Sequence, residues 1–136
     1  MRKTFFYITA LLSSYVATAQ VTPLSSDIQI KTAILAAPSD KREGAKVYGY
    51  ASDGSFTVLR KGSNDYVCIA DDPKKDDIGV SCYHADLDVF MERGRILAKE
   101  GKNQKEIFDI REKEVKSGKL KMPKQPSTLF VLSGKK

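Results

Sequence analysis

Few side chains in this sequence could take part in proton transfer or covalent chemistry. The chain contains a single histidine, His84. Imidazole has an unperturbed pKa suited to proton transfer near neutral pH, so His84 is the candidate acid–base residue, with Asp86 or Asp88 as its partner. The alternative is that His84 caps the helix expected after it. No serine lies in a Gly-x-Ser-x-Gly motif, so the sequence gives no support for a serine nucleophile.

Two cysteines, Cys68 and Cys82, lie in separate apolar segments with the composition of strands. In an oxidising compartment such a pair is expected to form a disulfide, whereas the alternative is two buried, unpaired cysteines. The spacing is not Cys-x-x-Cys, which argues against a catalytic redox pair. Together with His84 the cysteines offer three soft ligands, fewer than a structural zinc site uses. The sequence therefore predicts a Cys68–Cys82 disulfide, no metal site and no cofactor.

An aspartate-rich segment spans residues 71–77. Its carboxylates could offer oxygen ligands to a hard cation such as calcium. However, the segment lacks the alternating acid spacing and the glycine of the calcium-binding loop, and Lys74 and Lys75 neutralise part of its charge. We therefore predict a solvated turn here.

A lysine-rich segment precedes the last predicted strand. From residue 113 to residue 124 the single acidic residue is Glu114. Such a segment can attract an anionic surface or partner, although a solvated face is the simpler interpretation. Lysine without arginine or interleaved aromatic residues is a poor nucleic-acid signal, and we expect no nucleic-acid partner. The candidate binding residues are Lys113, Lys116, Lys119, Lys121 and Lys124.

Residues 1–19 have the pattern of a secretory signal peptide: a basic start, an apolar run from Phe5 to Val16, and a small-residue cleavage site at Ala17-Thr18-Ala19. The apolar run is shorter than the roughly 20 residues needed to cross a bilayer, so no transmembrane anchor is expected after cleavage. We therefore expect export to the periplasm or out of the cell. Cleavage removes two basic residues and no acidic one, which lowers the net charge from +6 to +4.

The elements that must position these side chains indicate a single α+β domain over residues 20–136. The Asp53-Gly54 pair is typical of a tight hairpin. Short strands separated by regular turns favour a small antiparallel β-meander with two to three helices packed on one face. Helical patterns cover about residues 26–36, 86–100 and 104–116, and strand patterns cover residues 45–51, 56–60, 66–70, 78–83 and 128–132.

The third helical segment, residues 104–116, has an apolar side that should face the core. Ile107, Ile110 and Val115, with Phe108 nearby, are predicted to pack inward. The prolines at 123 and 126 disfavour helix before them, so an extended linker is expected between this helix and the last strand.

Several segments resemble a group of uncharacterised exported bacterial proteins. The resemblance covers about residues 33–133, and the group has no established activity, so it implies no functional residue. It does imply that the chain is short or truncated after its last strand, because members of the group extend further. The segments that carry it are residues 36–47, 49–50, 68–73, 82–84, 90–95 and 118–123.

Three functional hypotheses follow from the sequence. The leading one is a non-enzymatic exported module that binds a small molecule or a partner protein. The second is a small exported hydrolase that uses His84 as its acid–base group. The third is that the chain is a fragment of a larger exported protein whose site lies past Lys136.

Overall fold

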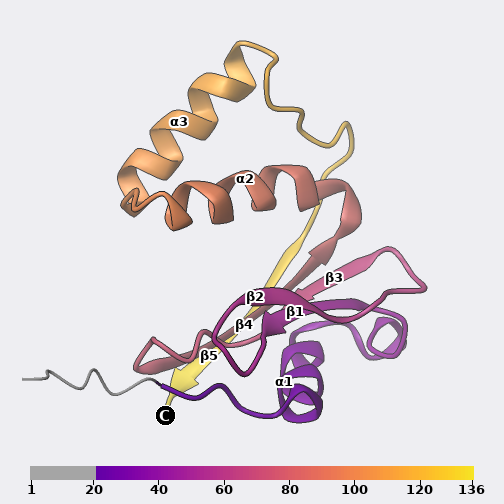
Figure 1. Cartoon of the computed structure of the whole chain (residues 1–136). Helices are drawn as coiled ribbons and strands as arrows, with labels where there is room; N and C mark the ends of the chain where they lie inside the picture. Colours follow the sequence, from indigo (N-terminus) through magenta and orange to yellow (C-terminus); the bar gives the residue numbers. More distant parts are fainter. Residues whose placement is uncertain (1–20) are drawn as a thin grey trace, which may run out of the picture.

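A five-stranded mixed sheet forms the centre of the structure, a computed structural model that describes residues 21–136 (Figure 1). The predicted signal peptide therefore lies outside the described residues. In the sheet the strands follow the order β2-β1-β3-β4-β5. Their bounds are Lys46–Tyr50 for β1, Phe56–Arg60 for β2, Tyr66–Ile69 for β3, Asp77–His84 for β4 and Leu129–Lys135 for β5.

The predicted α+β class is confirmed, but the sheet is not antiparallel throughout. β1 runs parallel to β3, while the other neighbouring strands are antiparallel. The chain leaves β2 and passes across the start of β1, where the backbone N–H groups of Ser63 and Asn64 donate to the Gly44 carbonyl. Gly62 makes this crossing possible, because a Cβ atom there would lie 2.7 Å from the Lys46 nitrogen. β3 consequently begins at the same end of the sheet as β1.

The sequence predicts helices on one face of the sheet, but the helices cover both faces. α1 (Ser26–Ala33) lies on one side, while α2 (Asp88–Lys99) and α3 (Gln104–Lys116) lie on the other (Figure 1). Short 3-10 turns follow α1 at Ile34–Ala36 and Ser39–Lys41 and precede α2 at Ala85–Leu87. None of the helices in residues 21–136 is long and apolar enough to cross a membrane.

The predicted disulfide is confirmed, and it lies in the core beneath α1. Cys68 and Cys82 are directly opposite each other on β3 and β4, with their Cα atoms 4.1 Å apart. Both cysteines are fully buried. Small side chains from the helix and the neighbouring strands pack around them, namely Ala33, Ala37, Ala45, Val47 and Ala70.

On the other face of the sheet, Tyr83 connects β4 to α2. Its buried hydroxyl donates to Asp88 Oδ1 at 2.8 Å and accepts from Arg95 Nη1 at 2.7 Å. Arg95 also pairs with Asp88 at 2.9 Å, and its guanidinium lies 5.2 Å from the centre of the Tyr48 ring. Burial raises the pKa of Tyr83 above its ordinary value, so the phenol stays protonated and can donate to Asp88.

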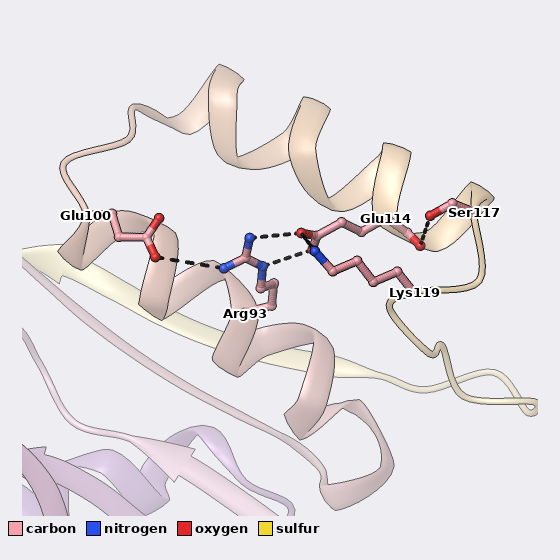
Figure 2. Close-up of polar contacts among 5 residues, drawn as sticks. All are labelled: Arg93, Glu100, Glu114, Ser117 and Lys119. Atoms are coloured by element: carbon pink, nitrogen blue, oxygen red, sulfur yellow. Dashed lines mark hydrogen bonds and ion pairs between the residues drawn. The ribbon is translucent and has the colours of Figure 1, made fainter.

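α2 and α3 form a helical hairpin that a partly buried ion pair holds together (Figure 2). Arg93 on α2 donates to both carboxylate oxygens of Glu114 on α3, at 2.8 and 2.9 Å. Glu100 lies 4.0 Å from Arg93, and Lys119 lies 3.6 Å from Glu114, so both extend the network.

α3 begins with a capping box. The Asn103 side chain accepts a hydrogen bond from the Glu106 backbone N–H, and the Glu106 carboxylate accepts one from the Asn103 backbone N–H.

Candidate binding site

His84 lies at the end of β4, where its side chain caps the 3-10 turn that follows. Its Nδ1 atom accepts a hydrogen bond from the backbone N–H of Asp86 at 3.3 Å, and the Asp86 carboxylate is 3.5 Å away. Its ring meets the Tyr66 ring edge-on. The carboxylate of Asp88, the other candidate partner of His84, accepts hydrogen bonds from Tyr83 and Arg95. His84 contributes to the lining of neither cavity described below.

The aspartate-rich segment leads into β4, and its first two carboxylates, those of Asp71 and Asp72, bind groups of the protein itself. Asp71 accepts from the Gly79 backbone at 2.8 Å and pairs with Lys136 at 3.1 Å. Asp72 accepts from the Lys74 backbone at 3.0 Å. Within residues 21–136 no group of three or more histidine, cysteine, aspartate or glutamate side chains is arranged to hold a metal ion.

The lysine-rich segment occupies the end of α3 and the linker after it. Lys116 pairs with Glu112 at 2.8 Å and Lys119 pairs with Glu114 at 3.6 Å. For the other three, Lys113, Lys121 and Lys124, the described part of the chain offers no carboxylate within ion-pair distance. All five lysines are exposed, as a solvated face requires. The segment therefore has excess positive charge beside the helical hairpin.

An apolar pocket of about 260 Å³ opens on the helical hairpin, at the end where the linker returns. Phe90 of α2, Phe108 and Val115 of α3 and Met122 of the linker supply its apolar lining. Phe108 is 62% exposed and Met122 is 46% exposed. The predicted inward packing of Phe108 is therefore wrong, whereas Ile107 is buried as predicted. Neighbouring helical residues point about 100° apart, so the two cannot share one face.

Arg111 lines the same pocket, with few partners for its guanidinium. Its Cζ atom lies 4.2 Å from the centre of the Phe90 ring, and Nη1 is 3.5 Å from the Phe90 carbonyl oxygen. Its Nε atom is buried and has no hydrogen-bond partner. Gly94 leaves space for this arrangement, because a Cβ atom there would lie 3.0 Å from Nη1. Burial lowers the pKa of Arg111, as expected for a cation without a counter-charge.

A larger cavity of about 430 Å³ lies on the opposite side of the molecule, between residues 21–24, α1 and β4. Its lining includes the apolar side chains of Ile78 and Val80. The two charged side chains of its lining, Asp71 and Lys136, pair with each other. The Gln29 amide donates to the Leu24 and Tyr50 carbonyls and accepts from the Tyr50 backbone. This cavity therefore has no comparable unpaired group to orient a ligand.

β5 forms one edge of the sheet and carries exposed apolar side chains. Leu129, Val131 and Leu132 are all exposed, with Val131 at 62%. The short Cα distance between Cys68 and Cys82 is typical of a pair that is not hydrogen-bonded, so the backbone groups of Cys82 point toward β5. The alternation of the ladder then directs the N–H and C=O groups of Val131 away from the sheet.

Sequence reasoning missed both Arg95 and Arg111. Each lies on a helix that the apolar pattern predicted correctly. That pattern gave no information on the contacts of the cationic side chains between the apolar positions. Their partners, Tyr83 for Arg95 and Phe90 for Arg111, lie on other elements. No sequence signal marks such contacts.

Comparison of the chain with protein-family profiles, with curated proteins and with solved structures gave no match. The assignment of a function therefore depends on the geometry of the chain itself.

Proposed function

We propose that this chain is a non-enzymatic exported module that binds a small molecule in the pocket of the α2–α3 hairpin. The observation that carries the proposal is the combination of an open apolar lining with a charged group that lacks a counter-charge, Arg111. Ligand sites are typically concave and apolar, with a small number of polar groups that fix orientation. The pocket volume of about 260 Å³ lies just below the usual range for ligand pockets, which suits a small ligand.

Export is supported by the signal-like residues 1–19 and by the Cys68–Cys82 disulfide, which is stable in oxidising compartments. The test is to express the full chain in a bacterium and determine the intact mass of the protein in the periplasm and medium. A mature chain that begins at Gln20 supports export. Protein that retains Met1 and stays in the cytoplasm contradicts it.

The pocket is tested by nuclear magnetic resonance on isotope-labelled mature protein, with octanoate and octanol as probes. We expect shifted amide signals around Phe108 and Met122 with at least one probe. Val115→Trp should abolish these shifts, because the indole fills the pocket that Val115 lines. Val89→Trp is the matched control, since Val89 is an exposed residue of α2 that does not line the pocket.

Two outcomes would contradict the proposed function. One is that neither probe shifts signals at the pocket. The other is that Val115→Trp and Val89→Trp reduce the shifts equally, which indicates a general effect of an added indole and not occupation of the pocket.

A further inference from the structure

Arg111 differs from the other two arginines of the helical hairpin. Arg93 is paired with Glu114, and Arg95 is paired with Asp88. For Arg111, no carboxylate of residues 21–136 lies within ion-pair distance, and the nearest acidic neighbour in sequence, Glu112, is paired with Lys116. The hydrogen-bonding capacity of this guanidinium is therefore largely unused within the described chain.

A cation held in this way is costly. Nε of Arg111 is buried without a hydrogen-bond partner, and Nη1 has one long contact at 3.5 Å. The Phe90 ring beneath the guanidinium provides a cation–π contact, but this contact does not satisfy the N–H groups. Buried polar groups without partners lower stability, and an anion that accepts their hydrogen bonds restores the loss.

The surroundings of the pocket favour an anion and an apolar body together. Besides Arg111, the charged side chains that line the pocket are Glu112 and Lys116. These two pair with each other, so Arg111 leaves the lining with one excess positive charge. The lining supplied by Phe90, Phe108, Val115 and Met122 is apolar. A small inorganic anion would leave that lining exposed to water, whereas a neutral apolar molecule would leave Arg111 without a counter-charge.

We infer that the hairpin pocket binds a small amphipathic carboxylate, with its carboxylate on Arg111 and its apolar body against Phe108, Val115 and Met122. This inference rests on the proposed function and specifies its ligand class. A guanidinium is planar and presents parallel N–H groups that match the two oxygens of a carboxylate. Arg111 is thus the residue that selects the charged head group, and the apolar side chains accommodate the rest.

The test compares three probes that share an apolar chain and differ in the head group: octanoate, octanol and octylamine. Dissociation constants are measured by nuclear magnetic resonance titration of the mature protein at neutral pH. We expect octanoate to bind about tenfold more tightly than octanol, which is the order expected for one charge-assisted hydrogen-bonded pair. Octylamine should bind most weakly, because its ammonium group is repelled by Arg111 and cannot accept the hydrogen bonds that Arg111 donates.

Arg111→Gln should remove the preference for octanoate over octanol. Lys105→Gln is the matched control, because it removes the same charge from the exposed side of α3, outside the pocket. It should retain the preference. Arg111→Lys keeps the charge without the planar fork and should retain part of it, which provides a second variant if Arg111→Gln folds poorly.

The results separate the two claims. Octanol binding at the pocket as tightly as octanoate in the natural chain overturns the carboxylate inference but leaves the proposed pocket in place. If Arg111→Gln does not weaken octanoate binding, the carboxylate inference is likewise overturned and the proposed pocket remains. If none of the three probes shifts signals at the pocket, both the inference and the proposed function fail.

Discussion

Cys82 and Tyr83 are consecutive on β4 and connect the sheet to helices on opposite faces. Cys82 is bonded to Cys68 in the core beneath α1, whereas the Tyr83 hydroxyl contacts Asp88 and Arg95 beneath α2. Side chains alternate between faces along a strand, so one dipeptide supports both layers. The first layer depends on a covalent bond and apolar packing, and the second on a partly buried polar cluster.

Removing the disulfide should destabilise the protein without changing its fold. We expect the Cys68→Ala/Cys82→Ala double variant to lose about 2–4 kcal/mol of unfolding free energy, because the unfolded chain regains the freedom that the cross-link removed. Denaturant unfolding followed by circular dichroism measures the change. The natural protein should lose similar stability in the presence of reductant, while the double variant should not respond. Equal stability with and without reductant would contradict the prediction.

Tyr83→Phe should loosen α2 from the sheet. The substitution keeps the ring and removes the hydroxyl that bridges Asp88 and Arg95. We expect a loss of about 1–3 kcal/mol, since the partly buried side chains of Asp88 and Arg95 lose a partner. Amide hydrogen exchange should show faster exchange in α2 than in α1. Tyr66→Phe is the control, because no hydrogen bond of the Tyr66 hydroxyl is found within residues 21–136; an equal loss in both variants would show that the polar cluster is not responsible.

The Arg93–Glu114 pair should make stability depend on pH in the acid range. Hydrogen bonds from Arg93 hold the pKa of Glu114 below its ordinary value of 4.5. A carboxylate whose pKa is lower in the folded protein stabilises the fold above its unfolded pKa, and this contribution is lost as the pH falls through the folded pKa. The natural protein should therefore be more stable than Glu114→Gln at neutral pH, and the difference should shrink below about pH 4.5.

Unfolding measured by denaturant across this pH range tests the prediction for Glu114. Glu100→Gln is a suitable control, because Glu100 also faces Arg93 but is 4.0 Å away and more exposed. Its effect should be smaller at every pH. A stability difference between Glu114→Gln and the natural chain that does not vary with pH would show that the ionised form of Glu114 is not what stabilises the hairpin.

The edge of β5 should promote self-association. An exposed apolar edge strand can pair with another chain through its free backbone groups. Val131→Lys places a charge at this edge and leaves the ladder with β4 intact, so we expect less association at a given concentration in sedimentation velocity. Val89→Lys is the control, because it makes the same substitution at an exposed position on α2. If both variants reduce association equally, net charge and not the β5 edge is the cause.

The sequence predicted individual elements best where local patterns decide them. The pattern over residues 104–116 matches α3, and the pattern over residues 56–60 matches β2. The Asp53-Gly54 turn is also present, with a positive φ of 79° at Gly54. The sequence predicts that the last strand ends at Leu132, but it extends to Lys135, because three of its seven residue pairs with β4 lie beyond the apolar run. Pairing with a neighbour, unlike composition, is a long-range property.

By itself the sequence determined the α+β class, the positions of most helices and strands, and a pair of cysteines suited to a disulfide. These follow from hydrophobic periodicity and turn chemistry, which act between residues close in the chain. The tertiary structure alone decided that β1 and β3 run parallel, that helices cover both faces, and that Arg111 lies at an apolar pocket without a counter-charge. These features depend on which elements meet in space, and packing between distant segments sets those contacts.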